Sequence, residues 1–266
     1  MSLHHAPLLY VFFETSNLEH QRMFCERVLG LPVIENQFHP PHEYHGLVKY
    51  DGGRLILSLN LSSERKFQQD ASDGMVTVLD VDRAAVLERL RAHGYQPPDG
   101  PDGLLTDTYG HHYLLREAPA AGGPAVQELR LTVADLAASV EFYSRVLGLE
   151  LLERGNGQAR LATGTVDLLL QAGALAPDGK TIRHDKYLIV FYAADIAATH
   201  AELIQRGLVF KATRVGYSDI GGTARFADPS GHVLCIYEPS EESLTWGSGA
   251  KVREIAASSA KERMPC

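Results

Sequence analysis

Hydrophobic residues along the chain follow two periods that alternate. Segments such as Leu8–Glu14 and Val126–Val133 are apolar or alternate at every second residue, which predicts strands. Segments such as Leu18–Leu29 and Leu136–Leu147 carry apolar residues three and four positions apart, which predicts amphipathic helices, and Gly30 ends the first of them. The same order of one strand, one helix and two or three strands occurs four times along the chain.

The first helix recurs in the third unit, 118 residues later. Residues 17–31 and 135–149 are identical at seven of 15 positions without a gap, including the run Arg-Val-Leu-Gly-Leu that ends both segments. Two unrelated amphipathic helices would share only scattered apolar residues, so the halves of the chain are predicted to be copies of one kind. They meet near Ala118–Pro124, whose Ala, Gly and Pro residues are typical of a linker.

The repeat predicts an α+β fold with two domains of two units each. A single unit would expose an apolar sheet face and open strand edges, so we expect neighbouring units to pair into one curved sheet. The first domain spans residues 7–118, with units at 7–61 and 73–118, and the second spans residues 125–240, with units at 125–172 and 186–240. Residues 241–266 depart from the repeat and form a C-terminal tail that holds Trp246, the only tryptophan.

Three phrases of the second half carry a recognisable pattern: VADLAASVEFYSRVLGLELL (Val133–Leu152), ADIAATHAELIQRG (Ala194–Gly207) and ARFADPSGHVLCIYEP (Ala224–Pro239). The first half matches through ETSNLEHQRMFCERVLGLPV and a turn at Asp107–Gly110 that lacks the usual proline. In these phrases the chain resembles the vicinal oxygen chelate superfamily, which includes glyoxalase I, bleomycin-resistance proteins and extradiol ring-cleaving dioxygenases. The resemblance covers about residues 7–240. It implies four βαβββ modules in two glyoxalase-like domains, each a U-shaped mixed sheet with outer helices around a cup.

The resemblance also implies positions for a metal centre, because relatives bind a metal through His, Gln or Glu on the first and last strands of the units. In the second half these positions fall on Glu128, Leu168, Leu188 and Cys235, of which only Glu128 is a hard oxygen ligand. In the first half they fall on Tyr10, Ile56, Leu114 and either Asp73 or Met75. A first-row metal normally needs about three protein ligands. We therefore expect no metal cofactor, with a divalent ion at Glu128 as the alternative.

Alternation along the strands predicts what lines the cups instead. The inward positions are mostly apolar or aromatic with a few polar groups, which is typical of a pocket for an organic ligand. The candidate ligand-binding residues are Glu128, Arg130, Leu168, Leu188, Tyr192, Cys235 and Tyr237 in the second half and Tyr10, Phe12, Glu14 and Arg116 in the first. The alternative is that these side chains merely fill a closed core. Charged residues at inward positions argue against it, because a buried charge needs a partner, water or a ligand.

Histidines form a second group of candidates. His39, His42 and His45 lie in one short loop with Glu43, where they could bind Zn or Ni, or could simply be solvated. His111 or His112 could complete such a site, although His111, like His232, follows a glycine in a turn, and turn chemistry is the favoured explanation of these two. His184–Asp185 could form an acid–base pair at a cup mouth, with a structural role as the alternative. Cys235 is expected to be an inert apolar thiol unless a cation such as Arg130 lies beside it.

Composition narrows the partners. The 25 Lys and Arg residues against 33 Asp and Glu residues give a net charge of −8, which argues against a general binder of nucleic acid or anionic membrane. The longest apolar run, Tyr187–Ala194, is far shorter than the roughly 20 residues of a membrane helix. No export leader is recognised, and three widely spaced cysteines favour reduced thiols in the cytoplasm.

Three functions remain open from the sequence. The first is metal-independent binding of an apolar or aromatic small molecule in a cup. The second is an enzyme, a metal-dependent lyase, isomerase or ring-cleaving dioxygenase, with ligands from unorthodox positions such as Glu128, His184 and the His39–His45 loop. The third is a structural or sensor module with filled cups. A small organic molecule is the expected partner, and the chain is expected to be a monomer or homodimer.

Overall fold

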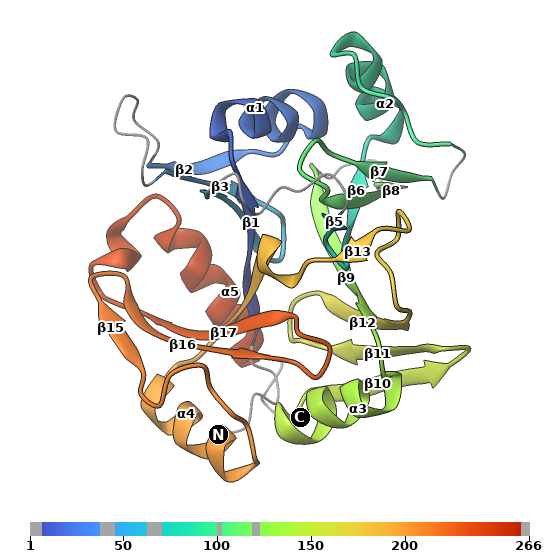
Figure 1. Cartoon of the computed structure of the whole chain (residues 1–266). Helices are drawn as coiled ribbons and strands as arrows, with labels where there is room; N and C mark the ends of the chain where they lie inside the picture. Colours follow the sequence, from blue (N-terminus) through green and yellow to red (C-terminus); the bar gives the residue numbers. More distant parts are fainter. Residues whose placement is uncertain (1–6, 38–45, 63–70, 100–102, 119–122, 262–266) are drawn as a thin grey trace.

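The computed structural model describes residues 7–37, 46–62, 71–99, 103–118 and 123–261. The histidine cluster of residues 39–45 lies outside these ranges. Within them the chain has an α+β fold with two large mixed sheets, which confirms the predicted fold class (Figure 1). None of the helices in the described ranges is long and apolar enough to span a membrane.

Each of the four units contributes a first strand, a helix and further strands, as the periodicity predicts. The first unit contains β1 (Leu8–Thr15), α1 (Leu18–Met23) with a π-helical continuation (Phe24–Leu29), β2 (Val33–Asn36), β3 (Leu47–Asp51) and β4 (Ile56–Leu61). The second contains β6 (Met75–Val81), α2 (Arg83–Ala92), β7 (Leu104–Thr106) and β8 (His112–Glu117). The third contains β9 (Ala125–Val133), α3 (Leu136–Glu141) with a π-helical continuation (Phe142–Val146), β10 (Glu150–Gly155), β11 (Gln158–Ala162) and β12 (Asp167–Ala172).

The fourth unit and the connecting segments complete the chain. The unit contains β14 (Tyr187–Tyr192), α4 (Ile196–Gln205), β15 (Gly216–Ser218), β16 (Gly221–Ala227) and β17 (Val233–Pro239). Two short strands, β5 (Ala71–Ser72) and β13 (Thr181–Ile182), pair with each other, and a 3-10 turn (His184–Lys186) leads into β14. The tail forms a 3-10 turn (Ser243–Thr245) and α5 (Gly249–Lys261).

Local capping explains where the first helix begins and ends. The Asn17 side chain accepts a hydrogen bond from the backbone amide of His20 at 2.9 Å, which satisfies one free amide at the start of α1. Gly30 has φ +76° directly after the π-helical continuation, a left-handed conformation that glycine adopts without strain. The repeated Leu-Gly-Leu sequence therefore marks the end of the helix in the first unit.

The sheets do not join the first unit with the second or the third with the fourth, contrary to the expectation from the sequence. The eight-stranded sheet has the order β15-β16-β17-β14-β1-β4-β3-β2, so it combines the first and fourth units. The seven-stranded sheet has the order β10-β11-β12-β9-β6-β8-β7, so it combines the second and third. Figure 1 shows the blue strands of the first unit in the same half of the molecule as the orange strands of the fourth. Every unit offers an equivalent edge on its first strand, so the hydrophobic pattern alone does not decide which two edges meet.

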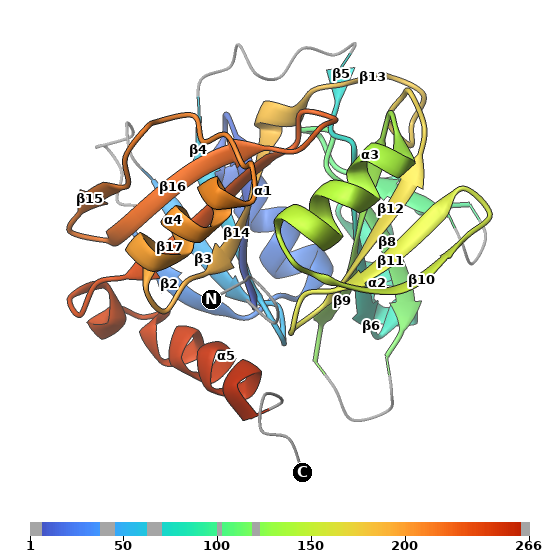
Figure 2. The same ribbon diagram turned by 90° about the horizontal axis from the view of Figure 1, so that it is seen from below.

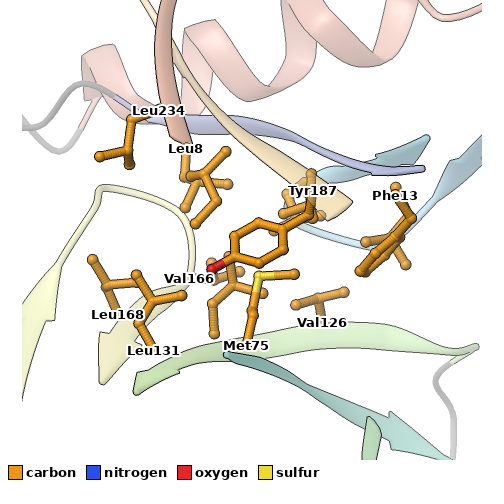
Figure 3. Packing of buried hydrophobic residues seen from close by; sticks show 14 of the residues in the cluster. Leu8, Phe13, Met75, Val126, Leu131, Val166, Leu168, Tyr187 and Leu234 are labelled. Carbon is orange, nitrogen blue, oxygen red and sulfur yellow. The ribbon is translucent and has the colours of Figure 1, made fainter. Parts of the chain in front are cut away.

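A continuous hydrophobic core lies between the two sheets and under the helices of the units. Figure 3 shows Leu8 and Leu234 of the eight-stranded sheet facing Leu131 and Leu168 of the other sheet, with Tyr187 between them. Leu168 is 0% exposed in this core, so its prediction as a cup residue is wrong. Parallel pairing of β12 with β9 sets Leu168 opposite core-facing Leu129. A phase error of one residue along a strand moves a side chain to the opposite face.

The tail covers the other face of the eight-stranded sheet. Val252 and Ile255 of α5 join a separate apolar cluster with Tyr10, Val190 and Tyr237. In Figure 2 the red α5 lies beside β17 and β2, away from the green and yellow strands of the seven-stranded sheet. The C-terminal segment that departs from the repeat is therefore a docked helix on one cup.

Candidate functional site

A cavity of about 320 Å³ lies in the cup of the eight-stranded sheet, between the sheet and the tail. The strands of the first and fourth units form its walls, and the tail contributes Leu244, Trp246 and Val252. Its aromatic lining consists of Tyr10, Phe12, Tyr237 and Trp246. The cup and its helical cover together therefore produce one internal space with a mostly aromatic and aliphatic surface.

Strand register explains why residues distant in sequence meet at this cavity. Tyr10 and Phe12 of β1 lie opposite Val190 and Leu188 of β14, and Val190 lies beside Cys235 of β17. Five sequence-predicted residues come together here, namely Tyr10, Phe12, Leu188, Cys235 and Tyr237.

Aromatic contacts hold the rings of this wall in place. The ring centroids of Tyr10 and Phe12 are 5.2 Å apart, and those of Tyr10 and Tyr237 are 6.0 Å apart in an edge-on arrangement. The Tyr237 hydroxyl donates a hydrogen bond to the backbone carbonyl of Ile220 at 2.7 Å and lies 3.2 Å from the Ser243 Oγ. These contacts leave the ring faces and edges as a preformed surface for a flat apolar ligand.

One ammonium group faces this aromatic cavity. Lys49 is 7% exposed, and its Nζ donates to Glu35 Oε1 at 2.9 Å and to Ser248 Oγ at 3.0 Å. The same Nζ lies 5.6 Å from the centroid of the Tyr10 ring and 6.0 Å from that of the Trp246 ring. Both distances are within the range of a cation–π contact. Glu35 therefore neutralises a charge that would otherwise be costly inside the cup.

The environment moves the pKa values of this pair. Burial lowers the pKa of Lys49, and the contacts with Glu35 offset only part of that shift. Burial also opposes ionisation of Glu35, but hydrogen bonds from Ser248 and Lys49 outweigh it and hold the pKa of Glu35 below its ordinary value. At neutral pH Lys49 and Glu35 accordingly form a buried ion pair, which is hydrogen-bonded to Ser248 of the tail.

The cup of the seven-stranded sheet has a different character. Glu128 is 3% exposed and accepts a hydrogen bond from Arg130 Nε at 2.6 Å, while its other oxygen pairs with Arg160. Arg160 also pairs with Asp167 at 3.0 Å. Arg116 of β8 pairs with Asp80 at 2.9 Å. Of the charged residues that were expected beside the aromatic ones, Arg116, Glu128 and Arg130 therefore belong to the second cup, each in an ion pair.

Other sequence-predicted residues are placed as follows. Tyr192 packs against the apolar cluster of the first cup without lining the cavity, and Glu14 is half-buried on β1, opposite Asn60. Glu14 and Arg116 lie in different sheets, so the expected charged pair inside one cup does not form. Glu128 and Cys235 are separated in the same way. This separation follows from the pairing of the first unit with the fourth.

The residues at the centre of each cup do not fit a metal centre. Cross-strand pairing gathers Tyr10, Ile56, Val190 and Cys235 in the first cup and Val78, Leu114, Glu128 and Asp167 in the second. The first set offers a phenol and a thiol, and the two carboxylates of the second are held by arginines. In the described part of the chain, no group of three His, Cys, Asp or Glu side chains could hold a metal ion.

His184 and His232 form a pair away from the cavity, in which His232 is buried and His184 is half-buried. His184 Nδ1 lies 3.1 Å from His232 Nδ1, and His232 Nε2 donates to the Thr132 carbonyl at 2.8 Å. Burial lowers the pKa of each imidazole to about 4. Asp185 pairs with Arg183 at 2.7 Å, so the expected acid–base pair of His184 with Asp185 is replaced by a contact between two histidines.

The histidines of the second unit are also buried and hydrogen-bonded. The Nδ1 of His111 is hydrogen-bonded to Asp73 Oδ2 at 2.8 Å, and its Nε2 is hydrogen-bonded to the backbone carbonyl of Glu14 at 3.0 Å. His112 lies 2.6 Å from Ser72 Oγ and 2.9 Å from Thr106 Oγ1. Burial opposes protonation of His111, but the nearby carboxylates outweigh it and raise its pKa. The imidazole rings of His111 and His112 therefore both have hydrogen-bond partners within the fold.

Burial raises the pKa of the Cys235 thiol to about 11. Arg225 of β16 is its cross-strand neighbour, whereas Arg130 lies in the other sheet. The cation at this thiol is therefore a different arginine from the one expected. Its effect is smaller than that of burial.

Sequence reasoning missed several cavity residues, chiefly Lys49, Asn60 and Trp246. The alternation of apolar Val48 and Tyr50 with polar Lys49 and Asp51 along β3 was a usable signal for Lys49. The one sequence feature that pointed to Trp246 was that it is the single tryptophan and lies in the tail outside the repeat.

Comparisons with known proteins agree with this architecture. The sequence model of the Glyoxalase/Bleomycin resistance protein/Dioxygenase superfamily matches residues 125–236. A search of curated proteins finds no match. The fold is similar to that of a putative dioxygenase from Bacillus subtilis subsp. subtilis str. 168, with 14% identity, TM-score 0.64, and 98% of this chain and 97% of that chain covered.

Glyoxalase I from Zea mays is similar to the same extent, with 15% identity, TM-score 0.65, and 95% of this chain and 96% of that chain covered. At such low identity the likeness to solved structures shows the shared fold. Residues 125–236 therefore match the Glyoxalase/Bleomycin resistance protein/Dioxygenase superfamily directly, and the fold seen in these solved structures extends over nearly the whole chain.

Proposed function

We propose that the protein binds an apolar or aromatic small organic molecule in the cup of the eight-stranded sheet, without a metal ion. The observation that carries the proposal is the cavity of about 320 Å³ lined by Tyr10, Phe12, Tyr237 and Trp246. An apolar cavity of about 150 Å³ in a protein core accepts benzene. A space about twice as large has room for two fused rings.

The chemistry of the walls supports an uncharged ligand. Lys49 is already neutralised by Glu35, and the lining holds one further residue of each sign, Arg225 and Asp219, so these charges need no charged ligand to balance them. The rings of Tyr10 and Tyr237 are fixed by their neighbours and lose little entropy on binding. Binding would release water from apolar surface, which contributes about 25 cal/mol for each Å² that is covered.

The contrast between the cups supports placing the ligand in the first. In the second cup Glu128 is enclosed by Arg130 and Arg160, and an apolar molecule there would have to displace water from charged groups. Metal independence is supported by the donor sets at the cup centres. The buried free thiols of Cys25 and Cys235 are consistent with the further proposal that the protein works in the reducing cytoplasm.

Calorimetric titration with benzofuran, a neutral molecule of two fused rings, tests the function. We expect saturable binding to one site and a change in Trp246 emission, because this single tryptophan lines the cavity. Leu188→Trp adds volume inside the cavity and should weaken binding at least about tenfold, since overfilling a packed space is unfavourable.

Leu152→Trp is the matched control, because Leu152 is 48% exposed on β10 of the other sheet. It should leave benzofuran affinity unchanged. The proposal fails if benzofuran and similar neutral aromatic compounds do not bind, or if Leu188→Trp binds benzofuran as well as the unmodified protein does.

A further inference from the structure

Two buried polar atoms on β4 have no hydrogen-bond partner in the described part of the chain. They are the Oγ of Ser58 and the Oδ1 of Asn60. Ser58 is 0% exposed, and the Asn60 side chain lines the cavity. Leaving a buried polar atom unpaired costs about 1–3 kcal/mol, so each such group calls for an explanation.

Strand register places both side chains on the cavity side of the sheet. Residues two apart in a strand face the same way, and Ile56 of β4 belongs to the apolar cluster of the cup. Ser58 lies between Phe12 of β1 and Lys49 of β3, and both of these line the cavity. Both side chains thus lie on the cup face of the sheet, and Asn60 is the one of the two that lines the cavity.

The chemistry of Asn60 Oδ1 specifies what would satisfy it. A carbonyl oxygen can only accept hydrogen bonds, so its missing partner is a donor. The ammonium of Lys49 already donates to Glu35 and Ser248, and the Gln37 amide, also on the cavity wall, donates to Glu35 at 2.6 Å. These two donors of the wall are therefore engaged with other groups, and a donor on the ligand can take the place beside Asn60 Oδ1.

We propose, on the basis of the binding function above, that the ligand is a neutral bicyclic aromatic molecule whose ring N–H or hydroxyl group donates to Asn60 Oδ1. The volume accommodates two fused rings, and the rings of Tyr10 and Phe12 provide the surface on which they lie. The Lys49 ammonium attracts the face of an aromatic ring.

Indole and benzofuran form a matched pair of probes, because they share one bicyclic shape and differ in that only indole carries a ring N–H. We expect indole to bind the full-length protein at least about fivefold more tightly than benzofuran by calorimetry, since an unmet buried acceptor disfavours the second probe. Asn60→Leu keeps the approximate shape of the side chain and removes the acceptor. In this variant the two affinities should become equal within about twofold, with benzofuran still bound.

Two further variants keep the test decisive. Asn60→Asp retains an acceptor and should retain the preference for indole, which covers the case in which Asn60→Leu does not fold. Gln37→Leu removes another cavity amide, whose nitrogen is already paired with Glu35, and should leave the ratio of the two affinities unchanged.

Equal affinities of indole and benzofuran for the unmodified protein would overturn this inference while leaving the binding function intact. Retention of the preference in Asn60→Leu would overturn the role of Asn60. Failure of both probes to bind would overturn the inference and the proposed function together.

Discussion

Glu35 accepts two hydrogen bonds from Ser248, one from its backbone amide at 2.9 Å and one from its hydroxyl at 2.6 Å. Ser248 directly precedes α5, so the carboxylate of Glu35 lies at the positive end of that helix. The other oxygen of Glu35 accepts from Lys49. A single carboxylate on β2 thus neutralises the Lys49 charge in the cavity and also binds the start of α5, the helix that covers the cavity.

Replacing Glu35 by Ala should therefore destabilise the protein strongly. The variant leaves the Lys49 ammonium buried without a counterion, which we expect to lower the free energy of unfolding by on the order of 3 kcal/mol. Urea unfolding followed by circular dichroism measures this change. The double variant Glu35→Leu, Lys49→Met removes both charges and should recover most of the loss. A double variant as unstable as Glu35→Ala would show that the ion pair is not the cause.

The histidine pair predicts a loss of stability in mild acid. The Thr132 carbonyl only accepts, so Nε2 of His232 carries the proton, and Nδ1 accepts from the Tyr187 hydroxyl, with His184 Nδ1 3.1 Å away. Protonation of His232 at Nδ1 would remove the hydrogen bond from Tyr187 and place a buried charge beside His184. Its pKa is lowered from 6.5 in the unfolded chain to about 4 in the folded protein, mainly by burial.

Because the folded pKa is the lower one, the unfolded chain binds the extra proton first as the pH falls. Stability should therefore be complete above about pH 6.5 and decrease toward pH 4, with on the order of 2 kcal/mol lost through His232 alone by about pH 5. His184 adds a smaller loss, since it is only half-buried. His111 has a raised pKa, so its stabilisation is already complete below about pH 6.5 and does not change this slope.

Urea midpoints between about pH 7 and about pH 5 test the prediction. His184→Gln removes one of the two titrating groups and should flatten the pH dependence. An unchanged slope in this variant, or a midpoint that is constant over this range, would contradict the assignment.

Local patterns in the sequence predicted the helices and strands of the fold, but they did not predict which units pair in each sheet. The helix that ends at Gly30 and the strand that holds Tyr10 were predictable, because their periods and capping residues are local. The pairing of Tyr10 with Val190 was not, because the first strand of each unit offers the same kind of edge. Connections and tertiary packing select among these edges, and a hydrophobic pattern contains no information on either.

The two sides of a strand could be read only where polar and apolar residues alternate. Along β12 the run Leu168–Leu170 is uniformly apolar, so the phase of the strand is hidden, and Asp167 rather than Leu168 lies beside Glu128 on the cup side. Trp246 was unpredictable for another reason. Its place at the cavity depends on the docking of the tail through Glu35, a contact between residues 213 positions apart.

Cys235 should react slowly with thiol reagents although it lines the cavity. Burial raises its pKa to about 11, so only a minute fraction is thiolate at neutral pH. In a variant with Cys25→Ala and Cys266→Ser, we expect iodoacetamide to modify Cys235 at least about 100-fold more slowly than a free cysteine at about pH 8. The urea-unfolded variant provides the matched control, because its thiol should react at the ordinary rate. Rapid labelling of the folded protein would indicate a cation-activated thiol instead.

Glu128 should behave as the centre of an ion-pair cluster and not as a metal ligand. Both of its oxygens are engaged by arginines, which compete with any cation for the same lone pairs. Protein incubated with Mn, Fe(II), Ni or Zn and then desalted should hold well under about one metal ion per chain by elemental analysis.

Glu128→Gln should leave that metal content unchanged. It should lower the free energy of unfolding by on the order of 1–2 kcal/mol, because it weakens two charge-assisted hydrogen bonds. Asp167→Asn, at the more exposed partner of Arg160, should cost less. Near-stoichiometric metal that is lost in Glu128→Gln would instead assign Glu128 to a metal centre and contradict metal-independent binding.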